Sequence, residues 1–173
     1  VPLGLGMATS IRVGFNVGAN DLSAARRSGW VAIGASFGFA LVAVTALLTL
    51  GPWVVGLYST EPEVVAVATG LLLIVAVYQI FDDVQVIAMG ALRGYKDTTV
   101  PFLIAVVCYW LISLPVALVF GYGVFDGLQL GVSGYWIGLA CGLICAALIL
   151  VTRFNRVSKQ HAQAAKGEQV PVV

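Results

Sequence analysis

Charged residues are scarce in this sequence. The 173 residues include nine lysines and arginines and eight aspartates and glutamates, so that only 10% of the chain is charged. A soluble domain carries about 25% charged residues, whereas 60% of this chain is hydrophobic. The composition therefore excludes an ordinary soluble domain and predicts an integral membrane protein that has the lipid bilayer as its partner. The net charge of +1 gives no reason to expect a nucleic acid as a partner, and we expect none.

Other features that the sequence lacks reduce the number of possible functions. The three cysteines, Cys108, Cys141 and Cys145, lie in apolar runs, so we expect neither a disulfide framework nor a Cys/His metal site. A GxxxxGK[ST] phosphate-binding loop is missing, so we expect no ATP-driven transport by this chain. We also expect no enzyme activity and no cofactor. Because the chain opens on Val-Pro without a methionine or a basic leader, we expect no signal peptide and a piece of a longer protein.

Most of the chain consists of long apolar runs, and each run is typical of a membrane-spanning helix. We expect an all-α, polytopic transmembrane helix bundle over residues 1–157, with the first span truncated. The spans are predicted near residues 1–17, 30–57, 64–92, 100–120 and 134–152. The polar residues 158–173 are predicted to form a disordered cytoplasmic tail.

Capping and helix-breaking residues mark two places in these spans. Asn20 or Asp21 is a candidate N-cap for the second helix, because both side chains can accept a hydrogen bond from the first turn. Pro115 falls inside the fourth span, where it removes a backbone donor and is predicted to kink the helix.

Glycines recur at four-residue steps on two of the predicted spans. Gly134, Gly138 and Gly142 lie on one face of the fifth span, and Gly34 and Gly38 lie on one face of the second. Such small-residue spacing lets neighbouring backbones approach closely. We expect a tightly packed neighbour on both faces.

The charges are unevenly divided between the turns. The basic residues fall near the ends of the first and third spans and in the tail: Arg12, Arg26, Arg27, Arg93, Lys96, Arg153, Arg156, Lys159 and Lys166. The turns after the second and fourth spans hold only acidic residues: Glu61, Glu63 and Asp126. Because positively charged loops stay in the cytoplasm, the C-terminus is predicted to be cytoplasmic.

Two carboxylates lie inside the predicted third span, Val64–Leu92. At 1.5 Å per residue the span is about 43 Å long, which is longer than a bilayer core of about 30 Å. A charge at that depth costs at least a few kcal/mol and usually marks an ion or substrate path. On a helical wheel these five polar residues form one wedge: Tyr78, Gln79, Asp82, Asp83 and Gln85. Asp82 lies between Tyr78 and Gln79, and Asp83 lies at the margin, so Asp82 is our candidate for the functional carboxylate. The alternative is an aspartate that only fixes helix packing.

Three segments carry a resemblance to a known family. Ser10–Gly14, Tyr78–Asp82 with Gln85–Val86, and Gly90–Asp97 resemble the MATE multidrug exporters, close to the bacterial NorM type. The resemblance covers residues 1–157 and implies a transporter of two six-helix bundles that face a central cavity. It implies that this chain is the last part of the C-terminal bundle and that its partner is the N-terminal bundle. It further implies export of small cationic or amphipathic drugs across a bacterial inner membrane in exchange for Na⁺ or H⁺.

The resemblance also assigns residues to the site. Tyr78 and Asp82 match the positions that the family associates with the coupling cation, whereas Asp83 departs from the family's small or apolar residue. Oxygen ligands suit Na⁺, and a carboxylate can also carry H⁺. If the exporter is sodium-coupled, Asp82 and Tyr78 are the expected metal ligands, with Asp83 and Gln85 beside them.

Three further residues have weaker assignments. Arg12 can pair with Asp82 or Asp83 when neither substrate is bound, although an arginine at the membrane interface is an alternative. Gln79 and Tyr109 can line the substrate cavity, although an aromatic residue in an apolar helix is more often a packing residue.

Rival functions stay open at this point. A related lipid or polysaccharide flippase and a passive channel or assembly subunit would both have apolar spans of this kind. An intramembrane aspartyl protease is disfavoured, because its two carboxylates must face each other across a site, whereas Asp82 and Asp83 diverge by about 100° on one helix.

Overall fold

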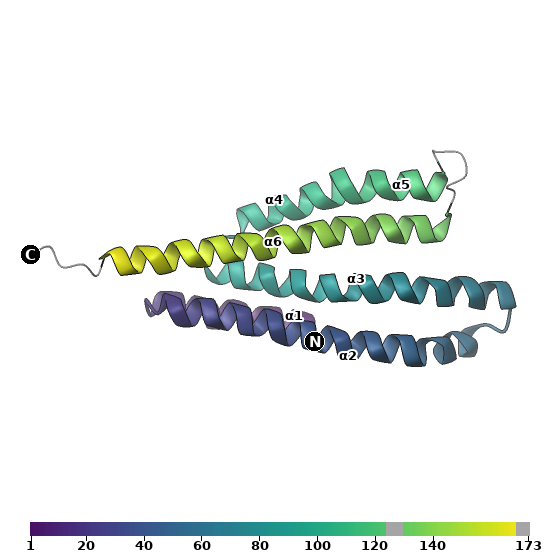
Figure 1. Ribbon diagram of the computed structural model, residues 1–173, viewed down its shortest axis with the longest axis horizontal. Coiled ribbons are helices and arrows are strands. Elements are labelled where there is room, and N and C mark those ends of the chain that lie inside the picture. Colours follow the sequence, from purple (N-terminus) through teal and green to yellow (C-terminus); the bar gives the residue numbers. More distant parts are fainter. Residues whose placement is uncertain (124–129, 169–173) are drawn as a thin grey trace, which may run out of the picture. The chain divides into compact units, whose positions relative to one another are not determined.

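The computed structural model describes residues 1–123 and 130–168, with side chains as far as residue 164, and this part of the chain is helical without strands. The elements in order are α1 (Pro2–Gly18), α2 (Leu22–Tyr58), α3 (Pro62–Gly94), α4 (Thr99–Val107), the π-helix η1 (Cys108–Ser113), α5 (Leu114–Tyr122) and α6 (Val132–Glu168) (Figure 1). The prediction of an all-α helix bundle is confirmed. Asp126, which entered the charge argument, lies outside the described residues.

Four helical stretches are long and apolar enough to cross a membrane. They are Leu22–Tyr58, Pro62–Gly94, Thr99–Tyr122 and Val132–Ala164. Helix α1 has 17 residues and is therefore about 25 Å long, somewhat shorter than a bilayer core of about 30 Å. The prediction of a polytopic membrane protein is confirmed.

A side-chain cap fixes the start of α2. The backbone N–H of Ala24 donates a hydrogen bond of 2.9 Å to Asp21 Oδ1, and the Ser23 hydroxyl donates one of 2.9 Å to the same oxygen. Asn20, with φ of 58°, makes the turn from α1 into this cap. Of the two predicted capping residues, Asp21 is the one that caps, and the helix therefore begins at Leu22, well before the apolar run at Trp30.

The C-terminal tail corrects a prediction. Residues 158–168 were expected to be disordered, but α6 continues through them to Glu168; residues 169–173 lie outside the described part. Ser158 is fully buried and donates a hydrogen bond of 3.2 Å to the Asn155 carbonyl. The ring of His161 lies 5.1 Å from that of Tyr95. The burial of Ser158 and the contact of His161 with Tyr95 give the polar segment tertiary support, which most helices need and which composition does not reveal.

The chain forms two compact units where the sequence predicted a single bundle over residues 1–157. Unit 1 comprises residues 1–37, 83–104 and 147–173, and unit 2 comprises residues 38–82 and 105–146. Helices α2, α3 and α6 are 37, 33 and 37 residues long, so each can contribute to both units.

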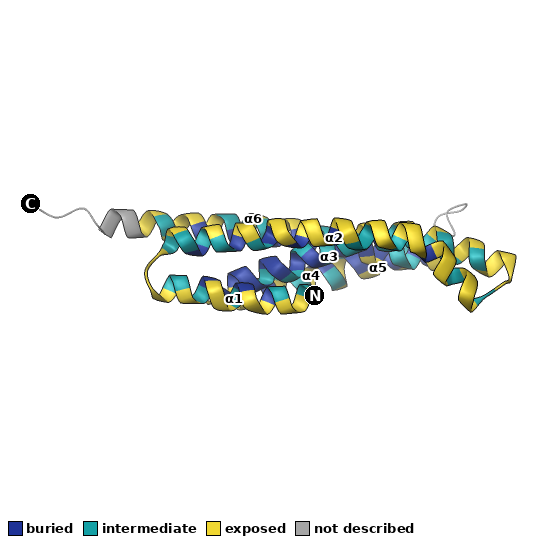
Figure 2. Ribbon diagram, turned by 90° about the horizontal axis from the view of Figure 1, so that it is seen from below, coloured by how far each residue is buried: buried dark blue, intermediate teal, exposed yellow. Residues whose placement is uncertain are grey.

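The core of unit 1 is built around Phe154 of α6. Phe154 is fully buried, and its ring lies 5.6 Å from that of Trp30 and 6.2 Å from that of Tyr95. Helices α1 and α3 approach closely at two glycines, since a Cβ on Gly90 would lie 3.2 Å from Gly6 Cα. The dark blue of α3 in Figure 2 marks buried residues along this helix. Small residues thus allow the close backbone packing that replaces the hydrophobic effect within a bilayer.

Unit 2 confirms the glycine face of α6. A Cβ added at Gly134 would collide with the backbone of Phe120, and one added at Gly138 would collide with the backbone of Ala117. At Gly142 it would lie 2.9 Å from the Cys108 carbonyl oxygen. The three glycines therefore seat α6 directly against η1 and α5, as their spacing predicted.

The prediction of a tightly packed neighbour at the glycine face of α2 is wrong for the residues that the structure describes. Neither Gly34 nor Gly38 would bring an added Cβ within 4 Å of another atom. Small residues permit close approach but do not supply a neighbour.

The predicted kink near Pro115 takes the form of a π-helix. Residues Cys108–Ser113 form one wide turn directly before Leu114 and Pro115. Proline has no N–H to donate to the preceding turn, so the hydrogen-bond register shifts at this point.

Candidate functional site: a carboxylate inside helix α3

Helix α3 holds all five residues of the predicted polar wedge. Tyr78, Gln79 and Asp82 fall in unit 2, and Asp83 and Gln85 fall in unit 1. Tyr78 and Asp82 are four residues apart and therefore share a helix face. We describe the two groups separately.

In unit 2 the structure brings three of the predicted residues together. Tyr78 interacts electrostatically with Asp82 and also with Tyr109, and all three side chains are half-buried. Tyr109 lies in η1, and a π-helix inside a longer helix is frequently found at a functional site. The phenol oxygens and the carboxylate thus form one polar cluster between α3 and η1.

Sequence analysis missed the residue on the other side of this cluster, Trp136 of α6. Its ring packs edge-to-face on that of Tyr78, with centroids 6.2 Å apart and an interplanar angle of 84°. A signal was available: Trp136 is two residues after Gly134 and so lies about 200° from the glycine face of α6. The glycines contact α5, so Trp136 lies on the face of α6 that is directed away from α5.

No basic residue exists in unit 2. All nine lysines and arginines, together with His161, belong to the segments that form unit 1. Within its own unit Asp82 consequently has no cationic side chain to balance its charge.

In unit 1 the remaining wedge residues are buried. Asp83 is fully buried, and Gln85 is 5% exposed. The helical wheel placed Asp83 at the margin of the wedge, yet it is more deeply buried than Asp82. The reason is that the α1–α3 contact lies just beyond it, with Val86 next to Gly6, where a Cβ would approach Val86 Cγ1 to 3.1 Å.

Arg12 is exposed on α1 in unit 1. It lines a groove of about 650 Å³ between α1 and α2. Asn16 and Ser28 also line this groove, and the Asn16 amide donates a hydrogen bond of 3.1 Å to the Ser28 hydroxyl. The ion pair that the structure places in unit 1 joins Arg153 to Asp97 and does not involve Arg12.

A cluster of three or more histidine, cysteine, aspartate or glutamate side chains is absent from the described residues. The Tyr78 hydroxyl is a neutral oxygen on the same helix face as Asp82.

The fold and this cluster define the class of protein. Several membrane-spanning helices with an ionisable residue inside one span are typical of proteins that move ions or solutes across a membrane. Comparison with known proteins identifies the family. The chain belongs to the MatE family, whose model matches residues 1–119.

Curated relatives are named as multidrug resistance proteins. The chain is 41% identical over 170 residues to the probable multidrug resistance protein NorM of Rhodopseudomonas palustris, covering 95% of this chain and 35% of that protein. It is 39% identical over 162 residues to the multidrug resistance protein MdtK of Yersinia enterocolitica, and the match covers 92% of this chain and 35% of MdtK. PmpM of Pseudomonas aeruginosa is also 39% identical over 162 residues, with 92% and 34% covered. The chain thus spans about a third of the length of these relatives.

Solved structures agree on the fold. The crystal structure of the eukaryotic MATE transporter AtDTX14 matches with a TM-score of 0.80 at 21% identity, covering 95% of this chain and 37% of that one. An inward-facing multidrug resistance MATE family transporter matches with a TM-score of 0.76 at 19% identity, and the match covers 91% of this chain and 37% of that transporter. The relatives are transporters, and none of these names indicates an enzyme.

Proposed function

We propose that this chain is the C-terminal part of a multidrug exporter of a bacterial inner membrane, and that the exporter exchanges drugs for Na⁺ or H⁺. The names of the relatives support drug efflux, and their greater length supports an N-terminal bundle as the partner of this chain. The assignment of the ion-binding site rests on one observation: Tyr78, Asp82 and Tyr109 form a polar cluster in a unit that contains no basic residue.

The mechanism follows from competition for one negative charge. Asp82 binds the coupling ion, with the Tyr78 oxygen as a second ligand if the ion is Na⁺. A cationic drug competes for the same carboxylate, so binding of the ion favours release of the drug. Tyr109 and Trp136 supply aromatic faces, which attract organic cations. The N-terminal bundle completes the cavity, and the exporter needs no other cofactor than the coupling ion.

Asp82→Asn in the complete exporter tests this assignment. At an effective dielectric near 20, two unit charges about 4 Å apart attract each other by about 4 kcal/mol, so removing the charge should weaken ion binding severely. We expect drug-stimulated cation flux in proteoliposomes to fall at least about tenfold, which corresponds to about 1.4 kcal/mol. Flux driven by a Na⁺ gradient and by a pH gradient is measured separately, which identifies the ion.

Glu63→Gln is the matched control, because Glu63 lies on the same helix but is exposed in its first turn. This variant should transport normally. Asp83→Asn tests the neighbouring carboxylate, and we expect only a modest loss. If Asp83→Asn abolishes flux while Asp82→Asn retains it, the coupling carboxylate is Asp83.

The same proteoliposomes separate the rival functions. Cation flux without any drug dependence indicates a passive channel, and movement of a lipid-linked sugar in place of drugs indicates a flippase. Either result would overturn the exporter proposal.

A further inference from the structure

A groove in unit 1 combines arginines with apolar side chains. It has a volume of about 360 Å³ and lies between Ile104 of α4 and the middle of α6. Its lining includes Ile104, Ile149, Thr152, Arg153, Arg156 and Gln160. None of the lining residues belongs to the Asp82 cluster or contacts it in an interaction described above, so the function of the groove is a separate question.

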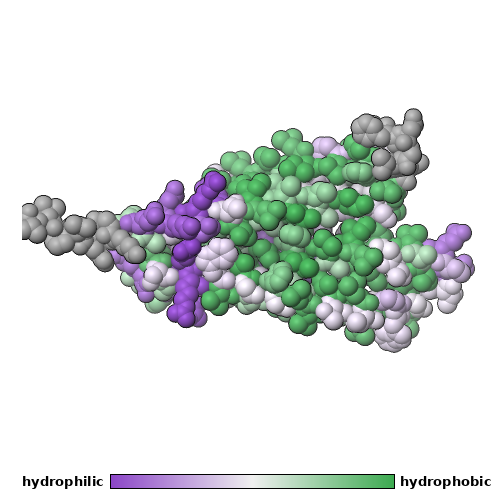
Figure 3. Space-filling view, viewed as in Figure 1, coloured by the Kyte–Doolittle hydropathy of each residue, from purple (hydrophilic) through white to green (hydrophobic). Residues whose placement is uncertain are grey.

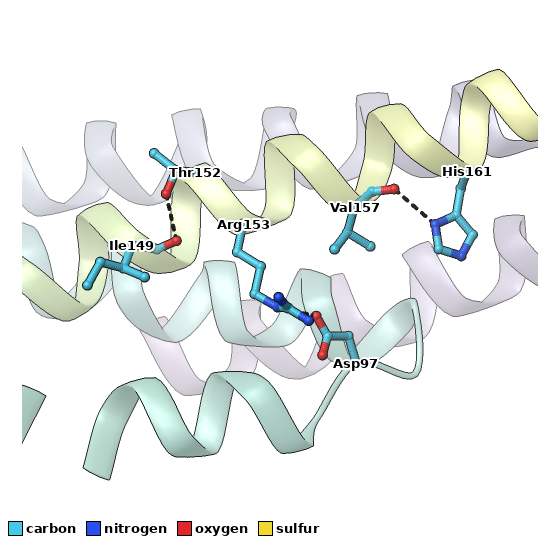
Figure 4. Close-up of polar contacts among 6 residues, drawn as sticks. All are labelled: Asp97, Ile149, Thr152, Arg153, Val157 and His161. Carbon is cyan, nitrogen blue, oxygen red and sulfur yellow. Dashed lines mark hydrogen bonds and ion pairs between the residues drawn. The ribbon is translucent and has the colours of Figure 1, made fainter. Parts of the chain in front are cut away.

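The basic side of the groove is held in place by an ion pair. Arg153 Nε lies 2.6 Å from Asp97 Oδ2, in the turn between α3 and α4, and the two side chains are 32% and 15% exposed. Figure 4 shows Arg153 reaching from α6 to Asp97. Arg156, one turn further along α6, is exposed and has no carboxylate partner among the described residues. The groove therefore carries one positive charge in excess.

The other side of the groove is apolar. Ile149 is 43% exposed, and Ile104 is half-buried on α4. Along α6 the sequence changes at this point from an apolar stretch, residues 134–151, to a basic one that begins with Arg153. Figure 3 shows the same change, from green hydrophobic surface to a gathering of purple side chains within unit 1. The groove thus lies at the change from the apolar to the basic part of α6, which is where we expect a membrane-spanning helix to leave the hydrocarbon.

We propose that this groove binds an anionic phospholipid. The phosphate would contact Arg156 and the guanidinium nitrogens of Arg153 that Asp97 leaves available, and an acyl chain would lie along Ile104 and Ile149. Basic pockets between membrane helices bind anionic lipid headgroups in this way. A cationic drug would be repelled by the excess charge, and a free phosphate would leave the apolar side uncovered.

Native mass spectrometry of the complete exporter, titrated with phosphatidylglycerol or with phosphatidylcholine, tests the proposal. We expect tighter binding of phosphatidylglycerol. Arg156→Gln should weaken that binding about fivefold, because each arginine near an anionic lipid surface contributes about that factor, and should leave phosphatidylcholine binding unchanged. This variant preserves the Arg153–Asp97 ion pair, so folding should be intact.

Arg93→Gln is the matched control, since Arg93 is an exposed arginine of unit 1 that does not line the groove. We expect its lipid binding to stay within twofold of the wild type. Arg156→Lys keeps the charge and should retain binding, which separates loss of charge from misfolding. Equal affinity for the two lipids, an equal loss in Arg93→Gln, or displacement of the lipid by millimolar inorganic phosphate would overturn the proposal.

Discussion

Asp21 shows how one side chain sets both the start of a helix and its dependence on pH. The Ala24 N–H, and after it the Ser23 hydroxyl, donates to the carboxylate and lowers the pKa of Asp21 below its usual 3.8. A lowered pKa in the folded state means that the carboxylate stabilises the fold above about pH 3.8. This stabilisation is lost as the pH falls through the lowered value.

We therefore predict that the first turn of α2 frays in acid. Hydrogen exchange of the amides of residues 22–26, corrected for intrinsic rates, should show protection at pH 6 that declines towards pH 3. Asp21→Ala should lose the protection at both pH values. Asp21→Asn should keep it at both, because asparagine caps as well as aspartate but does not titrate. Full protection in Asp21→Ala would show that the cap is not needed.

The candidate site illustrates which residues a sequence reveals. Asp82 is visible because a charge inside an apolar run is costly and has few structural explanations. Trp136 is not conspicuous in the sequence, since an aromatic residue in a membrane helix is usually a packing residue. Its role depends on which face of α6 meets α3, and only the three-dimensional packing determines that. The burial of Asp83 depends in the same way on the contact of α1 with α3.

At the scale of the element, the apolar runs predict where helices cross the membrane but not where they end. Helix α6 extends beyond its apolar stretch to Glu168, because Phe154, Ser158 and His161 present one face, at steps of four and three residues, to other parts of unit 1. Glycine spacing has a similar limit. It identified the contact of α6 with α5, but on α2 the same pattern meets only open space within the described chain.

The close contact of α6 with α5 leads to a stability prediction. In Gly138→Ala the new Cβ would collide with the backbone of Ala117, so α5 must move, at a cost of about 1–3 kcal/mol. Thermal unfolding of the detergent-purified exporter should occur at a lower temperature than in the wild type.

The control for this prediction lies in the same unit. Gly70 of α3 has open space around it, so Gly70→Ala should be neutral or stabilise by roughly 0.5–1 kcal/mol through the better helix propensity of alanine. If the two variants unfold at the same temperature, the glycine face of α6 does not determine the packing.

At the scale of the whole molecule, charge is divided between the two units. Unit 1 contains every lysine and arginine, and unit 2 contains none. This division has two consequences. It leaves Asp82 without a cationic partner in its own unit, and it also supplies the positive charges that orient a membrane protein during insertion. The predicted topology and the proposed role of Asp82 thus depend on the same property of the sequence.

The orientation is open to a direct test with single cysteines. Thr60 is exposed in the turn between α2 and α3, which carries only acidic charges, and Ala164 is exposed near the end of α6, between the basic residues Lys159 and Lys166. Because basic segments stay in the cytoplasm, Thr60→Cys should react with an impermeant maleimide added to intact cells. Ala164→Cys should react only after the membrane is permeabilised. The unmodified exporter is the control for its own thiols, of which Cys108 is buried and Cys141 and Cys145 are half-buried. Labelling of Ala164→Cys in intact cells, with Thr60→Cys protected, would reverse the orientation and place the Arg153–Arg156 groove in the outer leaflet.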